Sequence, residues 1–236
     1  MSELPRVLTW RIVPRSGRPR SAAAIPVSVL TMAPGLMDER VPPEVALLLP
    51  NGGGNNALLS AASGMPGEAP GAAIGLFMAD PFLNPPLIAR RLEMLGRSWV
   101  CNLPSGTQQD VEFSALLGDV NLDHGREVEQ LAAFGHRGHR ILVVTADAAD
   151  ARRAATINPD ALFVMPRVAD FAAGFPSFRQ RGSAISEVCD VVRAAGWTGP
   201  VLGLASVNEA AHESMWPPQL AGVVVRPVPV SPEARI

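Results

Sequence analysis

AIGLFMADPF (residues 73–82) and WVCNLPSG (residues 99–106) decide the fold, because each is an apolar run that ends in a polar residue near a proline. Between them, PPLIARRLEMLG (residues 85–96) predicts a helix. It starts with prolines, ends in a glycine, and spaces its apolar residues by three and four. Two buried strands joined by a helix form a βαβ unit. Asp80 and Asn102 then lie at the strand ends where parallel α/β folds bind ligands.

The apolar pattern of the whole chain predicts eight strands. Most are continuous apolar runs, as expected for strands that are buried on both faces. A helical pattern fills each gap from the third strand to the seventh, and eight such units predict a closed α/β barrel of the TIM (β/α)8 type. We expect a single domain over residues 1–236, with residues 1–20 as an N-terminal arm or extra strand. The predicted strands are Val27–Met32, Val45–Leu49, Ala73–Met78, Trp99–Leu103, Ile141–Thr145, Ala161–Met165, Val201–Ala205 and Gly222–Val225.

One side of the predicted barrel lacks covering helices, so the barrel is degenerate. Helices are missing or shortened after strands 1, 2 and 8, where the chain reads Pro34–Pro43, Asn51–Gly71 and Pro227–Ile236. The bare strands would expose a larger apolar patch than a monomer usually tolerates. We expect the apolar run Arg6–Val13 to cover part of it, and a second subunit the rest, as a homo-oligomer or with a partner chain. A sheet that stays open on this side is the alternative.

Composition excludes several classes of function. A net charge of −2 gives no electrostatic reason to expect nucleic-acid or membrane binding. The chain has no long apolar run and no signal-peptide pattern at its N-terminus, so we expect a soluble cytoplasmic protein. It contains no lysine and no tyrosine, which excludes Schiff-base chemistry and covalent pyridoxal phosphate (PLP). The glycine-rich turn NGGGNN (residues 51–56) does not have the glycine spacing of a dinucleotide-binding fingerprint, so we expect no nicotinamide cofactor. Cys101 and Cys189 are expected to be buried thiols.

The segments that follow the predicted strands at residues 73–78 and 99–103 also resemble a known family, with the match mainly within residues 73–165. Asp80-Pro81-Phe82, Asn102-Leu103-Pro104 and Glu127-Val128-Glu129 follow one another at a spacing that resembles the phosphoenolpyruvate hydrolase-like TIM-barrel family. That family has a strand ending in Asp-Pro-Phe and then an Asn-Phe-Pro-Thr turn. The resemblance implies a TIM barrel that acts on substrates similar to phosphoenolpyruvate or phosphonopyruvate.

The chain also departs from that family pattern. Met165-Pro166-Arg167 replaces a His-Met-Gly after strand six, and Ala205-Ser206 ends the segment that replaces a Cys-His-Gly-Gly after strand seven. Gly118-Asp119 replaces a pair of glutamates. The resemblance is therefore a better guide to the fold of this chain than to its reaction.

Three residues form the predicted catalytic set, because a closed barrel brings its strand ends to one rim. Asp80 could act as a general base or bind a divalent metal such as Mg²⁺. Asn102 could hold an enolate or carboxylate oxygen through its amide, and Asp110 lies nearby in sequence. For Asp80 and Asn102, the structural alternative is a helix cap or a turn.

Four further residues are predicted to bind a small anionic metabolite. Arg167 and Arg226 directly follow strands, and a guanidinium can hold a carboxylate or phosphate with two hydrogen bonds. Asn51 opens the glycine-rich turn and Ser206 follows the seventh strand. The structural alternative for each arginine is an ion pair with a loop acid. His124, at the start of a predicted helix, is a weaker candidate.

Two functions are consistent with this sequence. The first is an enzyme of hydrolase or lyase type that acts on a small carboxylate or keto acid at the C-terminal rim of the barrel. The second is a non-catalytic divergent barrel that binds a metabolite or serves as a structural subunit of an assembly. The departures from the family pattern and the thin wall favour the second function.

Overall fold

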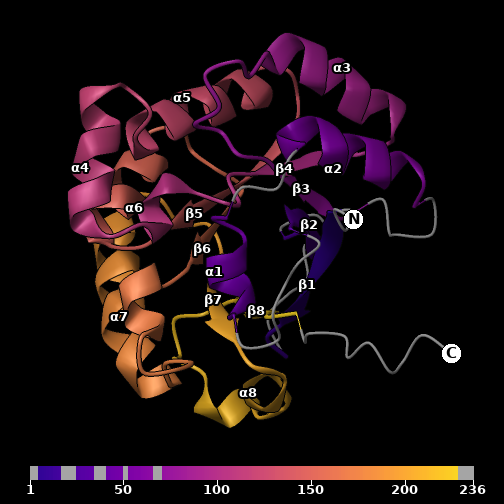
Figure 1. Ribbon diagram of the computed structural model, residues 1–236. Helices are drawn as coiled ribbons and strands as arrows, with labels where there is room; N and C mark the ends of the chain where they lie inside the picture. Colours follow the sequence, from indigo (N-terminus) through magenta and orange to yellow (C-terminus); the bar gives the residue numbers. More distant parts are fainter. Residues whose placement is uncertain (1–4, 17–24, 35–40, 50–52, 66–70, 228–236) are drawn as a thin grey trace, which may run out of the picture.

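Eight strands close into a barrel in which each strand pairs with its neighbours in chain order (Figure 1). The computed structural model describes residues 5–16, 25–34, 41–49, 53–65 and 71–227. From β2 to β8 all neighbours are parallel, which confirms the α/β barrel of the TIM type. The strands are β1 (Arg6–Pro14), β2 (Ser28–Ala33), β3 (Ala73–Gly75), β4 (Trp99–Cys101), β5 (Arg140–Thr145), β6 (Ala161–Val164), β7 (Val201–Ala205) and β8 (Gly222–Val225).

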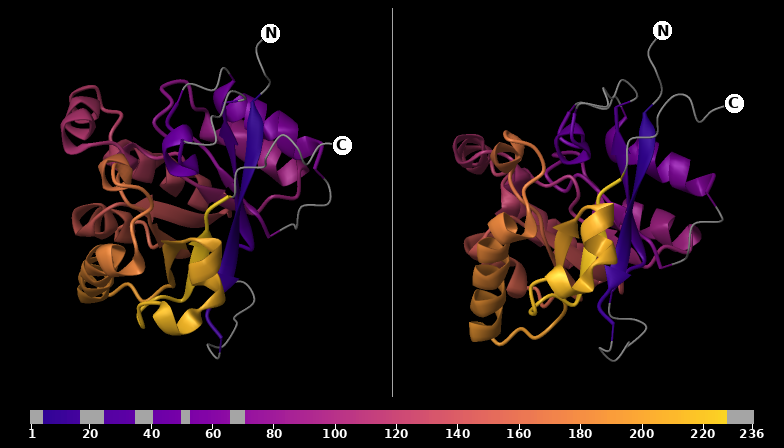
Figure 2. Two further views of the ribbon diagram at one scale, coloured as in Figure 1. Left: turned by 60° about the horizontal axis from the view of Figure 1, so that its bottom comes forward. Right: turned by 90° about the horizontal axis from the view of Figure 1, so that it is seen from below.

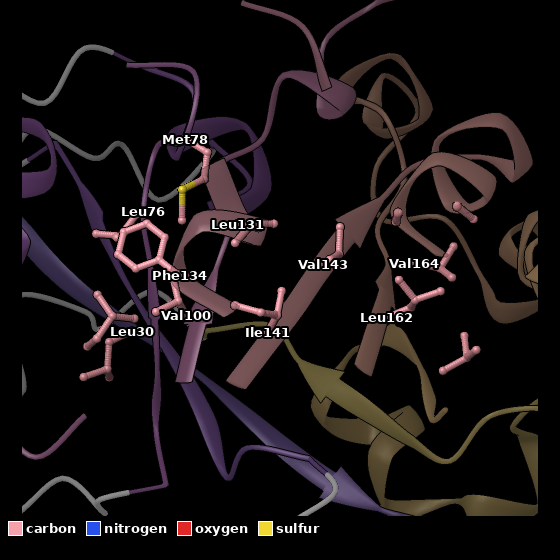
Figure 3. Packing of buried hydrophobic residues seen from close by; sticks show 14 of the residues in the cluster. Leu30, Leu76, Met78, Val100, Leu131, Phe134, Ile141, Val143, Leu162 and Val164 are labelled. Carbon is pink, nitrogen blue, oxygen red and sulfur yellow. The ribbon is translucent and has the colours of Figure 1, made fainter. Parts of the chain in front are cut away.

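The two faces of the sheet hold two separate apolar clusters. In β5, Ile141 belongs to the outer cluster, whereas its neighbour Leu142 belongs to the cluster inside the barrel. Figure 3 shows outward strand residues of the outer cluster beside Phe134 of α5 (His124–Gly135). Because successive side chains of a strand point to opposite faces, a strand with helices outside and a packed interior must be apolar throughout. This explains the continuous apolar runs of the sequence.

The N-terminal run forms a strand of the barrel itself. β1 pairs antiparallel with both β2 and β8 and so closes the ring. Trp10 and Ile12 of β1 join the inner cluster, and Trp10 Nε1 donates to Thr31 Oγ1 at 2.9 Å. The predicted strand Val45–Leu49 is wrong, since the chain forms helix α1 (Pro43–Ala46) and then a turn. Proline at the first helical position favours the helix, and a short apolar run by itself does not separate the two structures.

Helices join the parallel strands and cover the outside of the barrel (Figures 1 and 2). The predicted helices after β3, β4 and β5 are confirmed, and Asp123 and Asp147 cap the second and third of these. No helix in the described ranges is long and apolar enough to cross a membrane. Besides α1 and α5 the helices are α2 (Gly54–Ser63), α3 (Pro85–Met94), α4 (Val111–Asp119), α6 (Ala148–Ala155), α7 (Phe178–Ala194) and α8 (Val207–Ala211), with 3-10 turns η1 (Gly106–Gln108), η2 (Val168–Phe171) and η3 (Glu213–Met215).

The wall of the barrel beside β1 and β2 is thin, as expected, while residues 228–236 after β8 lie outside the described residues. Among the described residues no helix lies between β1 and β2, and only α1 and α2 follow β2, with α2 packed against it. The outward positions of β1 include the exposed residues Thr9 and Arg11. Polar side chains therefore occupy part of the surface that was expected to be an apolar patch. The homo-oligomer or partner subunit predicted for this side stays a prediction.

Apolar side chains fill the C-terminal mouth of the barrel. Leu47, directly after α1, is buried in the inner cluster with Leu103, Met165 and Phe171, which follow β4 and β6. In Figure 1, α1 lies over the centre of the ring of strands. TIM barrels carry their ligand sites at this face. Here the centre of the face is packed, so a ligand site must lie to one side of it.

Candidate functional site

Two of the predicted rim residues cap helices. Asp110 accepts a hydrogen bond from the Phe113 backbone N–H at 2.7 Å and starts α4, while Ser206 accepts one from the Glu209 N–H at 3.2 Å and starts α8. Both side chains thus satisfy N–H groups that a helix start leaves unpaired. Their roles in catalysis and substrate binding stay predictions. Asn51 lies outside the described residues.

Asp80 fixes the turn that precedes α3. Its Oδ1 accepts from the Phe82 N–H at 2.9 Å, and its Oδ2 lies 3.4 Å from Asn55 Nδ2. This is the turn-forming role that aspartate commonly has before such loops. In the described part of the chain no group of three or more His, Cys, Asp and Glu side chains is placed to hold a metal ion. The role of Asp80 as a base or Mg²⁺ ligand stays a prediction.

Asn102 follows β4 with its side chain on the outer, helix-facing side of the sheet. Its neighbours Cys101 and Leu103 both belong to the inner cluster, so the alternation of side chains turns Asn102 toward α5. Its amide oxygen accepts from the Val144 N–H at 2.7 Å, and its amide nitrogen donates to Glu127 Oε2 at 2.8 Å. The fully buried Asn102 therefore ties β4 to β5 and α5.

Glu127 is the centre of this buried polar cluster. Besides Asn102, it accepts hydrogen bonds from Ser105 Oγ at 2.5 Å and from the Gly106 N–H at 2.7 Å. Burial raises the pKa of Glu127, and the nearby His124 together with these hydrogen bonds offsets only part of that effect. The cluster fixes the loop between β4 and η1, which forms one wall of the pocket described below.

Arg226 holds α1 over the barrel mouth. Its Nη2 donates to Glu44 Oε2 at 2.6 Å, and Glu44 is only 1% exposed. Burial raises the pKa of Glu44, against the opposing charge of Arg226. The guanidinium groups of Arg226 and Arg181 both lie over the ring of Phe175, at 4.4 and 4.7 Å from its centroid. Arg181 in turn pairs with Glu209 at 2.7 Å. This cluster joins α1, α7, α8 and the end of β8.

A small pocket lies beside the packed mouth, where the ends of β4, β5 and β6 meet the first turns of α5 and α6. We call it the His124 pocket. Its volume is about 110 Å³, the space of about four water molecules at liquid density. Because the β/α units are parallel, the starts of α5 and α6 reach the same rim. The pocket is lined by Gly106, Thr107, Ser114, Leu117, Asp123, His124, Asp150, Arg153 and Arg167.

His124 is the polar side chain of this pocket whose burial needs an explanation. It is 5% exposed, and neither ring nitrogen makes a hydrogen bond to the described protein. Its Nδ1 lies 3.3 Å from Asp150 Oδ1, and Asp150 Oδ2, which lies 3.8 Å from Arg167 Nη2, has no hydrogen-bond partner among the described residues either. Buried polar groups of folded proteins are nearly always hydrogen-bonded, and each exception calls for a cause. A bound ligand or water is such a cause.

Arg167 reaches the same pocket from the end of β6. Its Nη1 donates to the carbonyl oxygens of Thr107 and Gln109, and its Nη2 donates to Asp147 Oδ2 at 2.6 Å. A guanidinium has five donors, so two are left without a hydrogen bond to the described residues. Burial alone would raise the pKa of Asp147, but hydrogen bonds from the Asp150 N–H, Arg167 and the Ala149 N–H outweigh it and lower the pKa. Asp147 stays ionised and orients Arg167.

Two larger cavities fit a reaction site less well. One of about 200 Å³ lies between β6 and α7 beside Arg181, whose Nε and both terminal nitrogens already donate to Pro176 O, Leu204 O and Glu209. The other, of about 500 Å³, lies beside His136 and His139 at the N-terminal ends of β5 and β6. In TIM barrels that face serves stability, and chemistry occurs at the opposite one.

The sequence pointed to only part of the His124 pocket. Arg167 was predicted as an anion anchor and His124 as a weaker candidate, whereas Asp150 was not considered. A signal was present: Asp123-His124 and Asp147-x-x-Asp150 both mark helix starts that follow strands in an α/β barrel. Both helix starts therefore had to reach the C-terminal rim.

Comparison with models of known protein families gives no match for this chain, and comparison with curated proteins gives none either. The resemblance to the phosphoenolpyruvate hydrolase-like family stays a prediction.

Proposed function

We propose that the chain is an enzyme of hydrolase or lyase type that acts on a small carboxylate or keto acid in the His124 pocket. One observation carries this proposal. His124 is buried at the C-terminal rim of an α/β barrel, next to a carboxylate and an arginine, and neither ring nitrogen is hydrogen-bonded to a described residue. Histidine is the side chain that most often serves as general acid and base in enzymes.

The neighbouring residues support distinct roles in this chemistry. Asp150, 3.3 Å from His124 Nδ1, orients the ring and favours the tautomer that leaves Nε2 free to accept a proton. Two donors of Arg167 have no acceptor among the described residues and suit the carboxylate of a substrate, since guanidinium and carboxylate pair bidentately. A pocket of about 110 Å³ has room for the carboxylate end of a small acid. The phosphoenolpyruvate- or phosphonopyruvate-like substrate implied by the resemblance is part of this proposal.

Turnover assays test the proposal. The purified protein is incubated with phosphoenolpyruvate, phosphonopyruvate and oxaloacetate, with and without Mg²⁺, and pyruvate release is measured. We expect turnover of at least one substrate and a loss of about 10²–10⁴-fold in His124→Asn, the range that general acid–base groups contribute. His136→Asn is the matched control, because His136 ends the same helix at the opposite face of the barrel. An equal rate in His124→Asn would overturn the assigned role.

A second function is favoured by the packing of the mouth. Leu47 and its neighbours fill the centre, and the described side chains of the predicted rim site all make hydrogen bonds within the protein. A barrel without catalysis that binds a small anionic metabolite in the His124 pocket would have these features. For this non-catalytic function we expect no turnover of any substrate. Calorimetry should instead show saturable binding of phosphonopyruvate, which His124→Asn weakens and His136→Asn leaves unchanged.

A further inference from the structure

Helix α4 has apolar side chains on its outer surface and no buried residue along its length. Phe113, Leu116 and Val120 lie on one side of it and are all exposed, with Leu116 61% exposed. Together with Glu112 they form what we call the α4 face. On the opposite side, Ser114 Oγ donates to the Gly106 carbonyl oxygen at 3.3 Å. Figure 2 shows α4 standing away from the barrel.

Such a helix needs a partner that covers it. Isolated helices shorter than about 12–15 residues are marginal in water, and α4 has nine. Three large apolar side chains at helical spacing are also the usual pattern of a helix that docks on another surface. Residues 110–120 include Asp110, Glu112 and Asp119 and no basic residue. The partner surface should therefore be apolar and carry a positive charge.

The outer side of α3 has this character. Leu87 and Met94 are 65% and 81% exposed, and the exposed Arg90 lies between them on the same side of the helix. We call these three residues the α3 face. The other side of α3 is already used, because Ile88 and Leu92 pack in the outer core cluster. Leu87 and Met94 around the basic Arg90 complement the apolar and acidic α4 face, and the exposed Glu93 lies at the edge of the α3 face.

The two faces cannot meet within one molecule. α3 and α4 lie on different sides of the barrel in all three views (Figures 1 and 2). We propose that the α4 face of one copy docks on the α3 face of a second copy, which gives a head-to-tail homo-oligomer. Pairing of two α4 faces would instead bring the acidic residues of both copies together. Head-to-tail contacts of one kind form closed rings or open chains, not only dimers.

A mixing experiment tests this arrangement. Light scattering of the wild-type protein at micromolar concentration should give a mass of more than twice the 24.9 kDa of one chain. Leu116→Asp removes the α4 face and Met94→Asp removes the α3 face, and each variant alone should be monomeric. Mixed together they should form a one-to-one pair, since one variant still has an intact α4 face and the other an intact α3 face. Met215→Asp, at an exposed methionine on η3, is the matched control and should assemble as the wild type does.

Each other outcome contradicts the proposal. A monomeric wild type would show that α4 stays uncovered or binds a different protein. If Leu116→Asp is monomeric but Met94→Asp still dimerises, two α4 faces pair with each other. Because the mutated side chains are exposed, each variant should unfold at the same temperature as the wild-type protein when both are compared as dilute monomers. A charge exchange gives independent support: Glu112→Arg and Arg90→Glu should each weaken assembly at least about tenfold, and the double variant should restore it.

Discussion

Asn102 offers the clearest test of how the site is built, because the structure makes it a structural tie and not a substrate ligand. Its side chain is fully buried and bonds to Val144 of β5 and Glu127 of α5. In Asn102→Ala the Val144 N–H loses its partner, and Glu127 loses one of its donors inside the protein. Both groups stay buried, so water does not replace the missing hydrogen bonds.

The expected loss of stability follows from these two groups. The Val144 N–H left unsatisfied costs about 1–3 kcal/mol, and the lost hydrogen bond to Glu127, which keeps its bonds from Ser105 and Gly106, costs about a further 1.5–3 kcal/mol, so the two together should cost about 3 kcal/mol or more. In a domain of 150–250 residues, 1 kcal/mol corresponds to about 2–4 °C in melting temperature. We therefore expect Asn102→Ala to melt about 6–12 °C below the wild type.

Differential scanning calorimetry provides the measurement. Asn208→Ala is the matched control, since Asn208 is exposed on α8 and should change stability by less than about 0.5 kcal/mol. The losses in Asn102→Ala and Glu127→Ala should also be less than additive in the double variant, because both remove the same hydrogen bond. A melting temperature of Asn102→Ala within about 2 °C of the wild type would refute the reasoning.

Three further predictions follow from the ion pairs and carboxylates. Arg226→Met leaves Glu44 buried without its partner and should cost about 3–5 kcal/mol; the double variant with Glu44→Gln should unfold at a higher urea concentration than Arg226→Met, and equal midpoints would contradict the pairing. Burial raises the pKa of Glu127 above its ordinary 4.5, so its contribution to stability is present below pH 4.5 and is lost as the pH rises through the folded value. The stability of Glu127→Gln relative to wild type should therefore increase over that range in urea titrations at several pH values, and a constant difference would count against it. Asp80→Ala should leave any turnover unchanged. Loss of turnover in a stably folded Asp80→Ala variant would instead indicate that the reaction takes place at the end of β3.

The barrel could be predicted from the sequence because its strands are apolar on both faces. Seven of the eight predicted strands exist, and the alternation of runs and helical patterns gave their order. Val45–Leu49 failed because five apolar residues also suit a helical turn, and the prolines before it settle the choice. Arg6–Val13 was expected to cover the barrel, not to close it. Whether such a strand pairs at the edge or in the ring depends on tertiary contacts, such as the hydrogen bond of Trp10, that no local pattern contains.

The candidate site was predicted less well, for a geometric reason. A residue at a strand end can point into the mouth or toward the helices, and one position in the strand decides between them. Asn102 points to the helix side and serves Glu127. Arg226 was expected to face substrate, but it pairs with Glu44, a residue 182 positions away that the sequence alone does not place beside it. His124 and Asp150 come from different helix starts and meet only once the barrel has closed.

The central claim is that ligands bind in the His124 pocket and not at the packed centre of the mouth. The most direct measurement follows the ring Cε1–Hε1 resonances of the four histidines by NMR while phosphonopyruvate is added. We predict that the His124 resonance shifts saturably, while those of His136, His139 and His212 stay in place. An unchanged His124 resonance at saturating phosphonopyruvate, with shifts elsewhere or none at all, would contradict the claim.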